Sequence, residues 1–235
     1  MIPFSPPRID QKVLDEVNAA LLSGWITTGP RTKLFEKRIS AYCGCKTTVA
    51  VNSWTMGMEV FLRWWGIGPG DEVIIPAPYW VSYPDMVILA GGTPIILECN
   101  EKQGFKINPT ELEKSITPKT KWIILNSPSN PTGACYTEKD IREIADILEK
   151  HPYVYILSDD IYEHVTYEGF KFFTIAQIDN LKDRVLTMNG VSKAYSMTGW
   201  RIGYAAGPKD IIKAIGKIQS QSTSNPSSIL SLIHI

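Results

Sequence analysis

The sequence contains few of the residues that hold structural metals or disulfides. Its 235 residues include only four cysteines and three histidines. Cys43 and Cys45 are the only close pair, and no second pair or histidine cluster stands near them. A structural zinc site needs four such ligands at defined spacings. We therefore expect no metal site, and free buried thiols instead.

The sequence also lacks an excess of either charge and any long apolar run. Lys+Arg and Asp+Glu both number 24, and the basic residues are dispersed. A nucleic-acid-binding surface needs a basic excess, so we expect no nucleic-acid partner. No apolar run could cross a bilayer, and the start "MIPFSPPRID" does not resemble a signal peptide. We therefore predict a soluble, cytoplasmic protein with no membrane partner.

Segments with helical apolar spacing alternate with short β-rich segments along the chain. Alternation with short connections indicates an α/β fold, in which a mostly parallel sheet is sandwiched by helices. Ser53 or Thr55 is expected to cap one helix and Thr137 another. The expected helices are 11–24, 31–44, 53–68, 83–92, 109–116, 137–151 and 208–220, and the expected strands are 47–51, 71–76, 93–98, 121–126, 153–160, 184–190 and 201–207.

Polar and aromatic side chains follow the predicted strands at the points where the strands end. In open α/β sheets, ligands bind at the carboxyl ends of the strands, so we expect these residues to converge on one edge. They are Tyr79 and Trp80 in "PAPYW", Asn130 in "NSPSNPTG", Asp159 and Tyr162 in "SDDIYEH", Lys193 in "NGVSK", and the helix start "SWTMG" with Thr55.

This set of side chains matches the chemistry of one cofactor, pyridoxal 5'-phosphate. A desolvated lysine is an amine nucleophile for its aldehyde, and a carboxylate can pair with its ring nitrogen. An asparagine and a tyrosine can hydrogen-bond its ring oxygen, a tryptophan offers a flat face, and an arginine with a helix amino terminus binds its phosphate. Pyridoxal phosphate presents all of these groups at once.

Taken singly, each residue also has a structural interpretation. Lys193 could be an ordinary solvent-exposed lysine, and Arg201 could form a surface ion pair. Asp159 and Asp160 could cap a helix or form a magnesium pair, and Trp80 could belong to the core. Their joint order and spacing favour the cofactor.

Three ordered motifs carry a family resemblance over about residues 70–230. "SPSNPTGACYT", "SDDIYEHVTYEG" and "SKAYSMTGWRIGYAAGP" resemble the motifs of class I aminotransferases, which are fold-type-I pyridoxal-phosphate enzymes, and the aspartate aminotransferase branch above all. The resemblance implies that Lys193 forms the internal aldimine and then moves the proton. It also implies that Asp159 binds the pyridinium nitrogen.

The same resemblance assigns the remaining cofactor contacts. Tyr162 and Asn130 hydrogen-bond the phenolic oxygen, and Trp80 stacks on the ring. Arg201 binds the phosphate, together with the backbone at Thr55 and Met56. Members of the family are homodimers, so a homodimer is implied, with small-molecule amino acids and 2-oxo acids as substrates.

Both ends of the sequence depart from this branch. Residues 1–77 resemble the amino terminus of the sugar aminotransferases, another group of the same fold type, and residues 78–230 resemble class I. The tail 231–235 resembles neither group, and the small carboxyl-terminal domain of class I is not recognisable. We therefore expect a mosaic, truncated chain that forms one large cofactor-binding domain, 1–230, with an incomplete substrate pocket.

The expected activity is transfer of an amino group between an amino acid, of aspartate or aromatic type, and a 2-oxo acid. Two alternatives remain open at this stage. The chain could bind pyridoxal phosphate without turnover, because the substrate pocket is expected to be incomplete. It could also aminate nucleotide-linked sugars, as the resemblance of residues 1–77 indicates.

Overall fold

The computed structural model describes residues 9–25, 28–64, 66–224 and 226, so the tail 231–235 lies outside the described residues. A mixed sheet of seven strands, flanked by helices, has the order β1-β7-β6-β5-β4-β2-β3. The chain divides into two compact units. The first unit comprises Met1–Val60 and Met188–Ile235, and the second comprises Phe61–Thr187.

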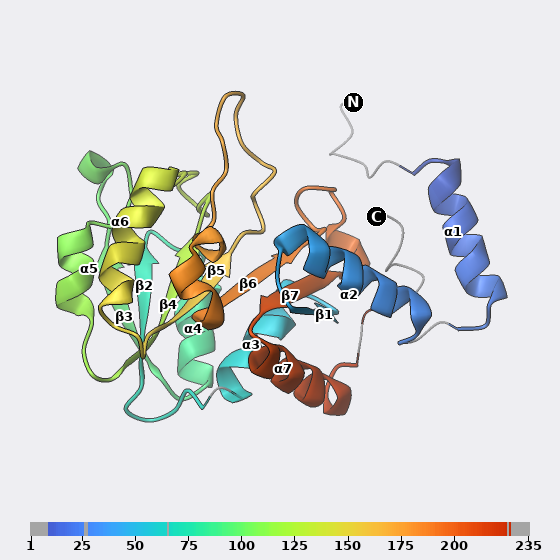
Figure 1. Ribbon diagram of the computed structural model, residues 1–235, viewed down its shortest axis with the longest axis horizontal. Helices are drawn as coiled ribbons and strands as arrows, with labels where there is room; N and C mark the ends of the chain where they lie inside the picture. Colours follow the sequence, from blue (N-terminus) through green and yellow to red (C-terminus); the bar gives the residue numbers. More distant parts are fainter. Residues whose placement is uncertain (1–8, 26–27, 65, 225, 227–235) are drawn as a thin grey trace. The chain divides into compact units, whose positions relative to one another are not determined.

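The second unit contains the parallel part of the sheet (Figure 1). Strand β2 pairs in parallel with both β3 and β4, and β4 pairs in parallel with β5. The middle of β2 and most of β4 are buried, which explains their runs of Val, Ile and Leu. The strands are β2 (Glu72–Ala77), β3 (Thr93–Glu98), β4 (Thr120–Asn126), β5 (Tyr155–Asp159) and the start of β6 (Val185–Gly190).

Helices of the second unit bury their apolar faces on these strands. In α6, Thr137 is the N-cap and forms a capping box with Asp140, as the sequence predicted. Arg184 donates hydrogen bonds to the carbonyl of Leu148 in the last turn of α6 and to the carbonyls of His151 and Val154 in the loop that follows it. The helices are α4 (Ser82–Leu89), α5 (Pro109–Ser115) and α6 (Glu138–Glu149), with 3-10 turns η1 (Glu101–Gln103), η2 (Ile175–Gln177) and η3 (Asp179–Arg184).

The first unit is built around an antiparallel strand pair, β1 and β7. Its core joins Phe35 of α2 to Ala50 of β1 and Tyr204 of β7. Gln219 of α7 donates a hydrogen bond of 2.8 Å to the carbonyl of Ala50, which ties that helix to β1. The elements are α1 (Gln11–Leu22), α2 (Pro30–Cys43), β1 (Thr47–Val51), the 3-10 turn η4 (Thr198–Trp200), β7 (Gly203–Gly207) and α7 (Lys209–Gln221).

Helix α3 (Trp54–Trp64) begins in the first unit. The amide of Gly57 donates to the carbonyl of Ser53 at 3.1 Å, which is the first α-helical bond. Ser53 therefore occupies the cap position, and the alternative cap Thr55 was wrong because it lies inside the first turn.

Several predicted boundaries were wrong by a few residues. The last predicted strand begins at Gly203 rather than Arg201, because Arg201 has a left-handed backbone with φ 56°. Helix α4 ends at Leu89, because Gly91 has φ 93° and cannot continue a helix. Pro208 precedes α7 as its N-cap instead of forming its first residue.

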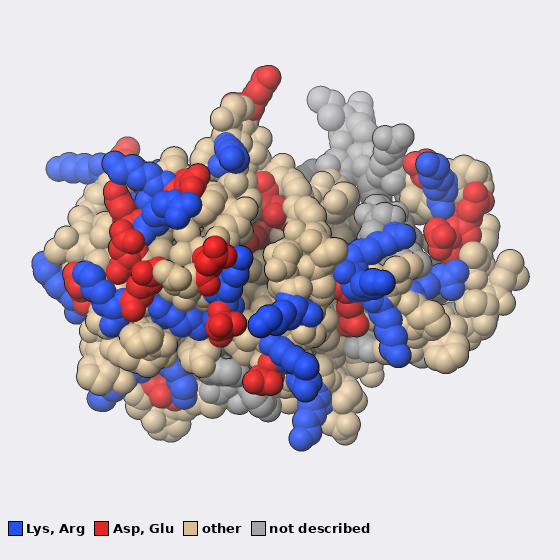
Figure 2. Space-filling view, in the orientation of Figure 1, with Lys and Arg blue, Asp and Glu red and all other residues tan. Residues whose placement is uncertain are grey.

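The part of the chain that the structure describes includes no helix with the length and apolar character needed to span a membrane. On the face shown in Figure 2, lysine and arginine side chains are interspersed with aspartate and glutamate.

Candidate active site

Asp159 is the last residue of β5 and is 4% exposed. Its Oδ2 accepts a hydrogen bond from the hydroxyl of Tyr83, and its Oδ1 accepts one from the amide of Ile161 at 3.3 Å. Burial raises the pKa of Tyr83 well above its usual value, and the neighbouring charge of Asp159 raises it further. Tyr83 therefore keeps its proton and donates, and Asp159 is the accepting carboxylate.

Asn126 connects the ends of β4 and β5. Its Nδ2 donates to the carbonyl of Asp159 at 3.0 Å, and its Oδ1 accepts from the amide of Asn130 at 2.8 Å. The Asn130 loop is closed further by a hydrogen bond of 2.9 Å from the amide of Ser129 to the carbonyl of Ala134. One side chain thus fixes the position of two predicted site residues relative to each other.

Asn130 and Tyr162 converge, as the sequence predicted. The Nδ2 of Asn130 lies 3.5 Å from the hydroxyl of Tyr162, and both residues are partly buried. Two donors from different loops are therefore presented side by side. Such a pair can bind a single oxygen acceptor between them.

Trp80 is partly exposed and contacts Tyr83. Their ring centroids lie 5.6 Å apart with an interplanar angle of 88°, an edge-to-face arrangement. Trp80 is absent from the buried core of the second unit. The core interpretation of Trp80 therefore does not account for its position.

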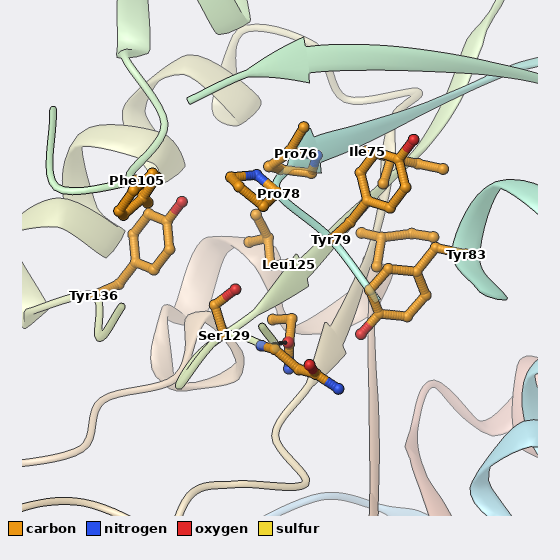
Figure 3. A pocket seen from close by; sticks show the side chains of 13 residues that line it. Ile75, Pro76, Pro78, Tyr79, Tyr83, Phe105, Leu125, Ser129 and Tyr136 are labelled. Carbon is orange, nitrogen blue, oxygen red and sulfur yellow. Dashed lines mark hydrogen bonds between the residues drawn. The ribbon is translucent and has the colours of Figure 1, made fainter. Parts of the chain in front are cut away.

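A pocket opens where β2 and β4 end (Figure 3). Tyr79 and Tyr83 line one side, and Phe105 and Tyr136 line the other. The hydroxyl of Tyr136 accepts a hydrogen bond of 2.9 Å from the amide of Ile107. The pocket lining consists of Ile75, Pro76, Ala77, Pro78, Tyr79, Tyr83, Phe105, Ile124, Leu125, Asn126, Ser129, Asn130 and Tyr136.

In the first unit, the loop between β6 and η4 carries Lys193, whose side chain is exposed. The hydroxyl of Thr198 donates to the carbonyl of Ser192 at 3.1 Å. The Nη1 of Arg201 donates to the carbonyl of Thr198 at 2.7 Å. Arg201 is therefore attached, through Thr198, to the loop that presents Lys193.

The amino terminus of α3 lies against β7 at Gly203. A Cβ at Gly203 would stand 2.9 Å from the backbone nitrogen of Trp54 and 3.1 Å from the carbonyl carbon of Ser53. Only glycine permits this approach. The amides of Thr55 and Met56 lie in the first helical turn, where no carbonyl of the same helix can accept from them. Such a helix start favours an anionic group.

Gly203→Ala is expected to lower the free energy of unfolding by about 1–3 kcal/mol, because the added methyl group overlaps the helix backbone. Chemical denaturation of the purified chain measures this change. Gly216→Ala is the matched control, since a Cβ at Gly216 meets nothing within 4 Å in the interior of α7. It should be neutral or stabilise by up to about 1 kcal/mol. Equal effects of the two substitutions would contradict the close approach of α3.

Asp160 differs from its neighbour Asp159 in both environment and partners. Its Oδ1 accepts from the hydroxyl of Ser158 at 2.7 Å, and that hydroxyl lies 3.2 Å from the hydroxyl of Thr174. Burial raises the pKa of Asp160 to about 7, although the hydrogen bonds from Ser158 and Thr174 act in the opposite direction. Among the described residues, no group of three His, Cys, Asp or Glu side chains could hold a metal ion.

The raised pKa of Asp160 predicts that the stability of the fold depends on pH. Its folded pKa of about 7 exceeds the ordinary value of 3.8, so the folded state binds the proton more tightly. The corresponding stability is fully present below pH 3.8 and is lost as the pH rises through about 7. In Asp160→Asn the side chain is uncharged at every pH, so the variant does not lose this stability as the pH rises. Between about pH 5 and about pH 8, the free energy of unfolding of wild type should fall by roughly 3 kcal/mol relative to that of the variant.

Urea unfolding of both proteins at the two pH values measures this difference. Parallel pH profiles for wild type and Asp160→Asn would mean that Asp160 titrates as an ordinary exposed carboxyl.

The structure groups the predicted site residues within each unit. The second unit brings together Asp159, Asn130, Tyr162 and Trp80 through Tyr83 and Asn126, two residues that the sequence analysis missed. Both had a signal in the sequence, because Tyr83 follows Trp80 by three positions and Asn126 ends the strand before "SPSNPTG". The first unit contains Arg201, which is linked through Thr198 to the loop of Lys193, and also the start of α3, which carries Thr55 and Met56.

Comparisons with known proteins all indicate the same family. Residues 10–234 match the model of the family "Aminotransferase class I and II". The "Probable aspartate/prephenate aminotransferase" of Rickettsia bellii is 65% identical over 164 residues, which are 69% of this chain and 41% of that protein. The "Aspartate/prephenate aminotransferase" of Cereibacter sphaeroides is 63% identical over 164 residues, with the same two coverages.

The similarity of fold extends over more of the chain. The crystal structure of the aspartate aminotransferase from Rhizobium meliloti has a TM-score of 0.88 and 41% identity, and the match covers 98% of this chain and 61% of that one. This chain spans only 41% of the length of the two curated relatives. The predicted change of resemblance near residue 77 is not tested by these matches and stays a prediction.

Proposed function

Because the chain belongs to the aminotransferase class I and II family, we propose that it carries out, within its whole protein, pyridoxal-phosphate-dependent transfer of an amino group from an amino acid to a 2-oxo acid. The names of the two curated relatives favour aspartate as one amino acid and prephenate as a 2-oxo acid partner. Both substrates are small molecules.

The proposal rests mainly on the groups that surround Asp159. A buried carboxylate, held by Tyr83 and by the amide of Ile161, is suited to pair with a protonated ring nitrogen. Asn130 and Tyr162 present two donors together, which suits a ring oxygen. The partly buried ring of Trp80 offers a flat aromatic face that suits stacking. These groups fit the ring of pyridoxal phosphate.

The first unit carries groups whose chemistry fits the phosphate and the aldehyde of the cofactor. Arg201 and the amides of Thr55 and Met56 are suited to a phosphate, because a guanidinium and a helix amino terminus both favour an anion. The glycine at 203 leaves room for the start of α3 beside β7. Lys193 is exposed on its loop and provides the amine that bonds to the aldehyde.

When bound, the cofactor supplies an electrophilic carbon and an electron sink. Lys193 would supply the amine that bonds to the aldehyde and, once released, the base for the proton on the substrate α-carbon. Asp159 keeps the ring nitrogen protonated through charge pairing. Asn130 and Tyr162 would hold the ring oxygen and so fix the orientation of the ring.

We propose further that the whole protein is a homodimer, as the family resemblance implies. The alternative functions make different predictions for the isolated chain. A binding-only protein attaches pyridoxal phosphate but leaves it in the aldehyde form. A sugar aminotransferase prefers nucleotide-linked amino sugars over amino acids as donors.

The test is to load the purified chain with pyridoxal phosphate and to add single amino donors. Visible absorbance distinguishes the aldehyde form of the cofactor from its amine form. We expect conversion with aspartate or glutamate, and reconversion when prephenate is added. Conversion only with nucleotide-linked amino sugars would support the second alternative, and no conversion with any donor would support the first.

A further inference from the structure

We propose that Tyr83 is a positioning residue, which fixes the carboxylate of Asp159 and the ring of Trp80 in the orientation that the pyridine ring of the cofactor requires. This inference rests on the proposed function and assigns a role to a residue outside the set that the sequence indicated.

Tyr83 lies between two candidate cofactor contacts, Trp80 and Asp159. Tyr83 lies in the first turn of α4 and is only 2% exposed. Its amide donates to the carbonyl of Trp80 at 3.0 Å, so the backbone around both rings is closed into a turn. Its hydroxyl donates to Oδ2 of Asp159 at the end of β5. One rigid side chain therefore links the residue expected over the ring to the residue expected at the ring nitrogen.

Each of the two carboxylate oxygens of Asp159 accepts from its own donor. Ile161 donates to Oδ1 from its amide, and Tyr83 donates to Oδ2 from its phenol. A carboxylate held at both oxygens cannot rotate about its Cβ–Cγ bond without breaking a hydrogen bond. Its remaining lone pairs therefore keep a constant direction, which is the preorganisation that electrostatic catalysis needs.

The proton of the hydrogen bond between Tyr83 and Asp159 resides on Tyr83. Burial raises the pKa of this phenol, and the charges of Asp159 and Tyr162 oppose its ionisation further. The phenol therefore remains a donor throughout the working pH range. A neutral donor adds orientation to Asp159 without neutralising its charge, so the carboxylate can still pair with a protonated nitrogen.

The experiment uses pyridoxal phosphate labelled with nitrogen-15 in its ring, because the chemical shift of that nitrogen reports its protonation. Wild type should show a protonated ring nitrogen, and Asp159→Ala should show an unprotonated one, which calibrates the scale. Tyr83→Phe keeps the ring and its edge-to-face contact with Trp80 but removes the donor. We expect its nitrogen signal to move toward that of Asp159→Ala.

The half-reaction with aspartate provides a second measurement. We expect its maximal rate to fall about 10- to 100-fold in Tyr83→Phe, because a hydrogen bond to a charged group is lost. The concentration of aspartate at half-saturation should change little, since Tyr83 is not expected to touch the substrate.

Thr120→Val is the control. Thr120 is a buried residue of the second unit, at 2% exposure, that does not line the pocket, and its hydroxyl accepts a hydrogen bond of 2.9 Å from the amide of Thr117. Both substitutions remove one buried hydroxyl and should lower thermal stability to a similar extent. Only Tyr83→Phe should move the ring-nitrogen signal.

Two results would overturn the inference, and they are distinguishable. A protonated ring nitrogen in both wild type and Tyr83→Phe, with equal half-reaction rates, would remove the role of Tyr83 and leave the proposed function intact. A wild-type nitrogen signal equal to that of Asp159→Ala, or no cofactor binding by wild type, would overturn the proposed function and this inference with it.

Discussion

Replacing Lys193 by alanine is expected to abolish covalent attachment of pyridoxal phosphate to the chain. The amine of Lys193 is the proposed nucleophile for the cofactor aldehyde, and alanine offers no substitute. Borohydride reduction followed by peptide mass spectrometry should place the pyridoxyl group on Lys193 in wild type and yield no adduct in the variant. The visible absorbance of the bound cofactor should disappear in parallel.

Lys213→Ala is the control for this experiment. Lys213 is an exposed lysine of α7 in the same unit, so both variants lack one exposed amine relative to wild type. The Lys213→Ala protein should retain the adduct on Lys193. An adduct mapped to any other lysine in wild type would end the assignment.

Replacing Asp159 by alanine is expected to slow the half-reaction with aspartate about a hundredfold. A charge-assisted contact with the ring nitrogen is worth about 1.5–3 kcal/mol, and its loss weakens the electron sink during removal of the α-carbon proton. Stopped-flow absorbance measures this rate. The reduced adduct on Lys193 should persist, because attachment to the aldehyde does not require the carboxylate.

Asp146→Ala tests whether loss of any carboxylate has the same consequence. Asp146 is exposed on α6 and belongs to the same unit. This variant should react at the wild-type rate. The pyridinium role of Asp159 is wrong if Asp159→Ala also reacts at that rate, or if it loses the adduct on Lys193 completely.

The elements of the fold could largely be predicted from local patterns. Helix α6 was predicted because Thr137 caps it and its apolar residues recur on one face. Strand β4 was predicted because a buried parallel strand is a short continuous apolar run. The antiparallel pairing of β1 with β7 was not predicted, since it joins segments about 150 residues apart and depends on long-range packing.

Some residues of the candidate site could likewise be predicted from local patterns, and others could not. Lys193, Asp159, Asn130 and Arg201 were predicted from motifs, because the chemistry of a cofactor demands particular side chains at strand ends. Tyr83 was missed, since a tyrosine in an apolar helical segment has the pattern of a core residue.

The sequence by itself determined the α/β class, the residues that carry the proposed chemistry and the resemblance to one family, because all three are encoded in local periodicity and in residue types at fixed spacings. Only the tertiary structure decided which other residues hold the candidate site residues in place. The hydrogen bond between Tyr83 and Asp159 joins positions 76 residues apart. The burial of Asp160 and the approach of α3 to Gly203 likewise arise from packing between distant segments. No local pattern specifies such contacts, because their free energy depends on neighbours that only the folded chain supplies.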